Sequence, residues 1–214
     1  MSSVDPTLNQ EIMNSIVARY PRKRSAIMPL LHYVQSVAGY VTNSGIENIA
    51  EMLEIATAEV SAVATFYTQY KFNPIGEYHV GVCTNTLCAV MGGDAIFSAL
   101  KEHLGIENDG VTADGKVSLE HIECNAACDY APVVMANWEF YDNQTVESAK
   151  ALVDGARAGN PPAPTRGPSR LVTYKQASAV LAGLNDGLAG EGVQAGGPTL
   201  LGLGIARAAE KGGK

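Results

Sequence analysis

The four cysteines of this chain could together bind a metal centre. They are Cys83, Cys88, Cys124 and Cys128, so a Cys-x4-Cys pair is followed by a Cys-x3-Cys pair. Thiols in a reducing cytosol are poor disulfide candidates. Four thiolates that converge on one point bind either a tetrahedral zinc ion or an iron–sulfur cluster. Metal binding is therefore the favoured interpretation.

Spacing alone leaves zinc as an alternative, because structural zinc sites also use paired cysteines a few residues apart. The two loops, 83–88 and 124–128, are rich in small, hydroxyl and amide residues. Such residues let backbone N–H groups approach the sulfurs, which a charge-storing cluster needs more than zinc does. The composition favours a cluster, while zinc, and then a disulfide or redox-active thiols, remain the alternatives.

Each cysteine pair follows a predicted strand. The expected order is a strand at 78–82, a helix at 94–104, a strand at 117–122, a hairpin at 133–136 and 139–141, and a helix at 145–158. This order is typical of a thioredoxin-like α/β sandwich. If the first two strands are neighbours in the sheet, their carboxyl ends bring the two cysteine loops together.

The residues before this region predict a helical bundle. Asp5 and Pro6 have the types of an N-cap and first turn, and apolar residues recur at helical spacing over 25–38. Ser44 and Glu47 have the spacing of a capping box, and Thr57 is expected to begin a further short helix.

The fold class expected is thus α+β, in three parts. Residues 1–75 would form the helical bundle domain, and residues 76–158 a thioredoxin-like domain that contains the four cysteines. Residues 159–214 are rich in Pro, Gly, Ala and Ser, with a possible short helix around 176–184. Such a composition predicts a low-complexity tail that is flexible or binds a partner.

Charge and hydropathy narrow the function classes. The 214 residues have a net charge of −7, and the cluster Arg22-Lys23-Arg24 is too small to suggest nucleic-acid binding. No stretch approaches the roughly 18 apolar residues of a membrane span. We expect a cytoplasmic protein without direct membrane insertion.

Several motifs, in order, resemble one family, the thioredoxin-like [2Fe–2S] subunits of respiratory complex I, NADH:quinone oxidoreductase. The motifs are Tyr20–Ala26, Val63–Tyr67, Cys83–Cys88, Gly92–Asp94, Glu123-Cys124, Ala127-Cys128 and Ala131–Val134. The resemblance spans about residues 10–158. It departs from the family at Met91, where an Arg is expected before the glycine pair.

The resemblance implies that Cys83, Cys88, Cys124 and Cys128 ligate one [2Fe–2S] cluster. It also implies an electron-transfer subunit, not catalytic alone, whose cluster lies beside the FMN of a flavin subunit that binds FMN and NADH. The large iron–sulfur subunit is a further expected partner, in the peripheral arm of a membrane-bound complex. An NAD-linked hydrogenase or formate dehydrogenase could use the same module, and a scaffold subunit with a structural metal is the alternative from another class.

Local charge predicts a low-potential cluster. No Lys or Arg occurs over 72–100 or 117–149, and Glu123 and Asp129 flank the second cysteine pair. Added negative charge would therefore be poorly stabilised. Ahead of the expected helix, Gly92-Gly93 indicates either a helix N-terminus facing the cluster or close packing of loop against helix.

Overall fold

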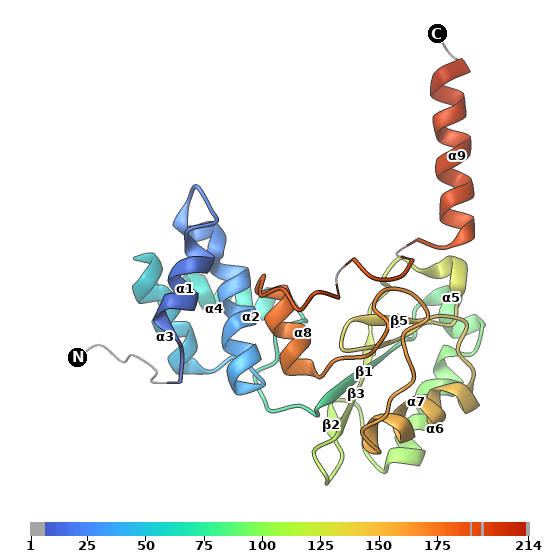
Figure 1. Cartoon of the computed structure of the whole chain (residues 1–214). Helices are drawn as coiled ribbons and strands as arrows, with labels where there is room; N and C mark the ends of the chain where they lie inside the picture. The colour runs from blue at the N-terminus through green and yellow to red at the C-terminus, as the bar shows by residue number, and fades with distance from the viewer. Residues whose placement is uncertain (1–6, 189, 194, 213–214) are drawn as a thin grey trace. The chain divides into compact units, whose positions relative to one another are not determined.

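The computed structural model describes residues 7–188, 190–193 and 195–212 (Figure 1). These residues contain a five-stranded sheet in the order β2-β3-β1-β4-β5. The strands are β1 Tyr78–Cys83, β2 Gly110–Val111, β3 Val117–Ile122, β4 Val134–Ala136 and β5 Glu139–Tyr141. Strand β4 is antiparallel to both β1 and β5. The predicted strands and hairpin are confirmed, and so is the neighbouring position of β1 and β3.

Strand β1 is buried along its whole length. All six of its residues are buried, and Val80 and Val82 are fully inaccessible. Gly81 has no side chain, and an added Cβ would lie 2.6 Å from the Ile122 side chain of β3. A run of β-branched and small residues is suited to a central strand with neighbours on both sides.

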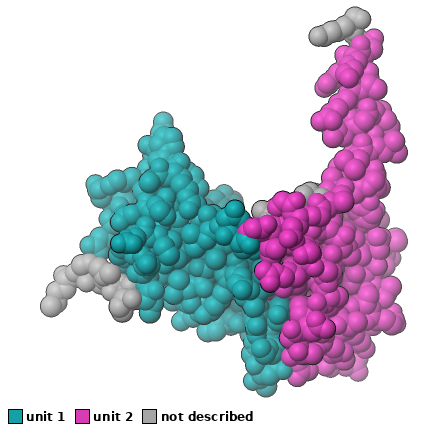
Figure 2. Space-filling view, viewed as in Figure 1, with its two compact units in different colours: residues 1–79, 111–118, 172–186 teal, residues 80–110, 119–171, 187–214 magenta. Residues whose placement is uncertain are grey.

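The chain divides into two compact units (Figure 2). The first contains residues up to His79, Val111–Ser118 and Val172–Asp186. The second contains Val80–Gly110, Leu119–Leu171 and the residues from Gly187 onward. One boundary between the units thus falls within β1 and another within β3, the strands that precede the two cysteine loops.

The first unit is largely helical. Its helices are α1 Gln10–Val17, the 3-10 turn η1 Lys23–Ala26, α2 Ile27–Ala38, α3 Asn43–Leu53, α4 Thr57–Phe66 and α8 Tyr174–Leu181. Helix α2 supplies much of the core, with Leu30 and Leu31 fully buried. The apolar periodicity read from the sequence predicted this arrangement.

Two helix starts differ from the expected ones. Thr42, rather than Ser44, caps α3, because its hydroxyl accepts a hydrogen bond from the Gly45 N–H at 3.0 Å. Helix α1 begins at Gln10, after Asn9, whose side chain accepts from two N–H groups. Asp5 and Pro6 lie outside the described residues.

The second unit contains helices α5 Thr86–Val90, α6 Gly93–Leu104, the 3-10 turn η2 Cys128–Tyr130, α7 Val146–Arg157 and α9 Gly197–Gly212. Helices α6 and α7 pack against each other, as Figure 1 shows. Both were predicted, and Thr145 caps α7 by accepting from the Ser148 N–H. The short helix α5 was not expected.

The region expected to be a tail contains packed structure. Helix α8 packs on α2, Tyr174 is 1% exposed, and the Gln35 amide lies 3.4 Å from the Ser178 hydroxyl. Tyr174 contributes the large apolar area that the surrounding composition lacks. Helix α9, in contrast, has exposed residues throughout. Among the described residues, no helix is long and apolar enough to cross a membrane.

Candidate metal centre

The first cysteine pair is built into the interior of the second unit. Cys83 is the last residue of β1 and is 2% exposed, and Cys88 lies in α5 and is 3% exposed. Both belong to an apolar cluster with Val133 and Met135. The Cys83 N–H donates to the Val133 carbonyl at 3.1 Å. Ordinary core packing therefore fixes this pair of thiols.

Gly93 allows helix α6 to approach the first cysteine loop. An added Cβ at this position would lie 2.9 Å from the carbonyl oxygen of Cys88 and would also meet the carbonyl of Cys83. Gly92, the residue before it, has a left-handed φ of 114°. Close packing of helix against loop, one of the two interpretations of the glycine pair, is therefore observed at Gly93.

The second cysteine pair lies in an exposed loop. Cys124 and Cys128 are both exposed, and their sulfurs are 3.5 Å apart. Ala126 has a left-handed φ of 56°, and its N–H donates to the Cys124 sulfur at 3.4 Å. This contact is the kind of backbone hydrogen bond that the small residues of the loop were expected to permit.

Two contacts connect the loops. The Asn85 side-chain amide, in the first loop, donates to the Ile122 carbonyl at the end of β3 at 3.2 Å. Ala127, in the second loop, is 6% exposed and belongs to the same apolar cluster as Cys83 and Cys88. Neighbouring strands therefore bring the two loops together.

The thiols also influence one another electrostatically. Burial raises the pKa of the Cys88 thiol to about 11, a backbone hydrogen bond with Val133 opposes this, and the Cys83 and Cys128 sulfurs raise it further. Hydrogen bonding to Cys124 is the main cause of a raised pKa at Cys128. Several thiols held this close favour the protonated form unless a cation compensates their charge.

The four cysteines are arranged as two pairs, Cys83 with Cys88 and Cys124 with Cys128. Within the described ranges, no group of three or more His, Cys, Asp or Glu side chains converges closely enough to hold a single metal ion. A [2Fe–2S] cluster is held by four cysteine thiolates. The donor chemistry of four free cysteines, in two loops that share one apolar cluster, fits such a cluster.

One arginine approaches the second loop from a distant part of the sequence. The guanidinium carbon of Arg166 lies 5.6 Å from the ring centre of Tyr130, two residues after Cys128. Arg166 also forms an ion pair with Asp142 at 3.0 Å. Sequence reasoning missed this residue, because nothing in its local composition signals a contact with the cysteine loop.

Three histidines contact residues other than the cysteines, and Met91 lies at the surface. His32 is buried in the first unit, where its ring lies 4.8 Å from that of Tyr70. His79 contacts the Ser118 hydroxyl, and His103 contacts Asp154. Met91 follows α5 and is 56% exposed.

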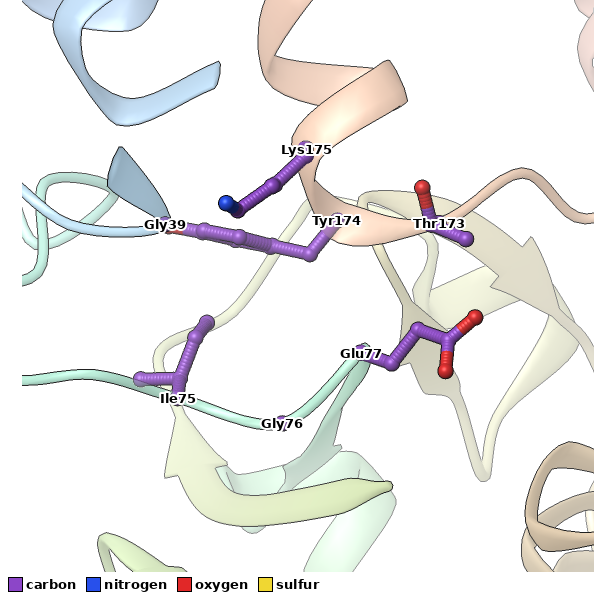
Figure 3. Close-up of a pocket in the computed structure, with 7 residues that line it drawn as sticks. All are labelled: Gly39, Ile75, Gly76, Glu77, Thr173, Tyr174 and Lys175. Atoms are coloured by element: carbon purple, nitrogen blue, oxygen red, sulfur yellow. The ribbon is translucent and has the colours of Figure 1, made fainter. Parts of the chain in front are cut away.

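A cavity of about 340 Å³ lies in the first unit (Figure 3). It is lined by Gly39, Ile75, Gly76, Glu77, Thr173, Tyr174 and Lys175. Lys175 donates to the Val37 carbonyl at 2.8 Å, and Glu77 pairs with Lys116. These charged groups already have partners within the protein, and we assign the cavity no function.

A thioredoxin-like sheet with a cysteine pair after each of two neighbouring strands defines a class of small iron–sulfur proteins. Residues 13–157 match the family described as thioredoxin-like [2Fe-2S] ferredoxin. This match covers more than half of the chain, and the chain belongs to that family.

Individual relatives of this chain are named as subunits of one enzyme complex. A protein of Mycobacterium bovis, named as a subunit of NADH-quinone oxidoreductase, is 61% identical over 193 residues, covering 90% of this chain and 76% of the relative. The protein of the same name from Rickettsia bellii is 42% identical, covering 70% and 91%. The NADH-quinone oxidoreductase subunit 2 of Thermus thermophilus is 39% identical, covering 70% and 84%.

Among solved structures, an NAD+-reducing [NiFe]-hydrogenase in the air-oxidized state is similar, with a TM-score of 0.56 and 19% identity. The match covers 63% of this chain and only 23% of that chain. At this identity the likeness concerns the fold alone.

Proposed function

We propose that this chain is an electron-transfer subunit of an NADH:quinone oxidoreductase and holds one [2Fe–2S] cluster through Cys83, Cys88, Cys124 and Cys128. One observation carries the proposal: neighbouring strands β1 and β3 lead to two cysteine loops that share one apolar cluster. The family membership and the names of the relatives agree with this chemistry.

A [2Fe–2S] cluster, when bound, supplies one-electron transfer. The chain's residues prepare its environment. The four thiols release their protons on binding, and the raised pKa of Cys88 makes that release dependent on the metal. The Ala126 N–H donates to a sulfur, which helps to stabilise negative charge. The apolar residues around Cys83 and Cys88 limit access of water to that side.

The chain is not expected to catalyse a reaction alone. Its sequence contains no Gly-x-Gly-x-x-Gly motif, which would suggest a dinucleotide site. FMN and NADH therefore belong to a flavin subunit, and the large iron–sulfur subunit is a second partner. The proposal thus assigns the chain to the cytoplasmic peripheral arm of a membrane-bound complex.

The hydrogenase likeness favours a second candidate, an equivalent subunit of an NAD-linked hydrogenase. It rests on the fold alone. The relatives at 61% and 42% identity are named as subunits of NADH-quinone oxidoreductase, and so they favour the first candidate. Purification of the tagged chain from its native cell separates the candidates, since a co-purifying nickel–iron subunit would contradict the first.

The proposed cofactor is tested on the purified, anaerobically prepared chain. Iron, sulfide and zinc are assayed, and EPR spectra are recorded before and after dithionite. We expect equal amounts of iron and sulfide. The oxidised protein should give no EPR signal, and the reduced protein should be paramagnetic. A colourless protein with one bound zinc ion would contradict electron transfer and favour the scaffold alternative.

A further inference from the structure

We propose that Arg166, in a segment distant from the cysteines, is a positioning residue for the exposed second cysteine loop. The inference rests on the proposed function, because it concerns how the chain holds its cluster. The proposal assigns a role to part of the region after Gly159, whose composition predicted only a tail. The contacts that support this role lie within the second unit.

The Arg166 side chain is enclosed between aromatic rings and an acid. Its guanidinium carbon lies 4.1 Å from the ring centre of Phe140 and 5.6 Å from that of Tyr130. It pairs with Asp142 at 3.0 Å, and the two side chains are 14% and 9% exposed. An arginine can stack and pair at once, because its planar guanidinium offers both a face and donors.

The backbone around Arg166 is fixed to the β4–β5 hairpin. The Thr165 N–H donates to the Phe140 carbonyl at 2.9 Å. The Thr165 hydroxyl accepts from the Asp142 N–H at 3.0 Å. The Tyr141 hydroxyl donates to the Pro162 carbonyl at 2.7 Å. Arg166 is therefore held in place independently of the second cysteine loop.

Tyr130 connects Arg166 to the second cysteine loop. It ends the turn η2, which begins at Cys128, and its N–H donates to the Ala127 carbonyl at 3.0 Å. Its carbonyl accepts from the Asn143 N–H at 2.8 Å. The Tyr130 ring thus connects the cation of Arg166 to the residues on either side of Cys128.

A later part of the chain closes around the same tyrosine. Gly196 lies against Tyr130, because an added Cβ would be 2.5 Å from the ring carbon that bears the hydroxyl. The Gly167 N–H donates to the Val193 carbonyl at 3.1 Å, and the Thr199 hydroxyl donates to Asp129 at 3.3 Å. Residues before helix α8 and residues after it therefore both contact the loop that contains Cys128.

Loss of the arginine charge would act on the loop in two ways. The Tyr130 ring would lose a cation partner, and the Asp142 carboxylate would be left buried without its ion pair. Removal of the Arg166 charge would also leave the surroundings of the loop that contains Cys128 more negative. The loop should become mobile, and the cluster should become easier to remove and harder to reduce.

The test compares Arg166→Gln with Arg166→Lys and with the control Arg170→Gln, in the full-length chain loaded with cluster. Arg170 is exposed and lies four residues away. Cluster loss to an iron chelator is followed by absorbance, and the reduced EPR spectrum and midpoint potential are measured. We expect Arg166→Gln to lose its cluster about 10- to 100-fold faster, because outer-shell changes lower metal affinity by about that factor at other sites. Arg166→Lys should restore part of the difference, and Arg170→Gln should match the wild type.

Equal loss rates, spectra and potentials for the wild type and Arg166→Gln would overturn the proposal. A variant that folds poorly is replaced by Thr165→Val, which removes the anchoring hydroxyl but keeps both charges. Hydrogen exchange of residues 124–130 in the cluster-free chain provides a readout that needs no cluster. Faster exchange in Arg166→Gln supports the positioning role even if the wild type holds zinc, whereas unchanged exchange contradicts it.

Discussion

The two cysteine loops provide the same donors but are supported in different ways. Cys83 and Cys88 are enclosed by neighbouring apolar residues and by the close approach of α6 at Gly93. Cys124 and Cys128 are exposed and depend on turn geometry and on contacts with residues far along the chain. The same ligand type can therefore be held by local packing or by long-range polar contacts, with different sensitivity to mutation.

The largest expected difference concerns the cysteines themselves. We expect both Cys88→Ser and Cys124→Ser to lose most of the cluster, measured as iron and sulfide per chain. Only Cys88→Ser should also destabilise the cluster-free protein, by about 1–3 kcal/mol, because it buries a hydroxyl in apolar surroundings. Urea unfolding of the two variants measures this, and equal stabilities would contradict the contrast between the loops.

Acidification should weaken the protein through a residue in neither loop. Burial lowers the pKa of His32 from 6.5 to about 4. The unfolded chain then binds a proton that the folded chain does not, so stability is lost as pH falls from about 6.5 towards 4. The loss amounts to about 3 kcal/mol. Urea titrations across this range should show a flatter profile for His32→Leu, and an unchanged profile would exclude His32 as the cause.

Close packing at the first loop can be tested at a single glycine. Gly93→Ala should destabilise the protein by about 1–3 kcal/mol, since its Cβ would meet the backbone of Cys83 and Cys88. The control is Gly202→Ala in α9, where φ is not positive and an added Cβ meets nothing within 4 Å. Thermal unfolding compares the two. Only Gly93→Ala should also alter the EPR spectrum of the loaded chain.

The smallest effect is expected at the second loop. Ala126 has φ 56°, a conformation that costs an L-residue about 1 kcal/mol. Ala126→Gly relieves this strain but increases the entropy of the unfolded chain, so stability should rise by less than about 1 kcal/mol. Urea unfolding measures the change, and a clear destabilisation would show that the alanine methyl group is needed.

Sequence patterns predicted the elements that depend on local periodicity. The strand 117–122 and the helix 94–104 were recovered because apolar spacing reports burial directly. The start of α3 was misplaced, since Thr42 and Ser44 are both suitable caps and only the backbone decides between them. Helix α5, at five residues, is too short to show a period.

For the candidate site, too, local patterns could be predicted from the sequence, and long-range contacts could not. The cysteine spacing indicated the donors, and the strand order indicated that the loops would meet. The roles of Tyr174 and Arg166 were not visible, because each depends on a partner many residues away within a stretch of low-complexity composition. Composition describes an average, whereas one well-placed aromatic or cationic side chain is enough to fix a segment.

The contacts of Tyr130 have a consequence for the order of events during synthesis. The chain emerges from the ribosome N-terminus first, so all four cysteines appear before Arg166, and well before Gly196 and Thr199. The partners that contact the second cysteine loop are thus made after all four cysteines. An ordered site for the cluster is therefore complete only after Thr199 has emerged, and cofactor insertion should follow the synthesis of these later residues rather than that of the cysteines.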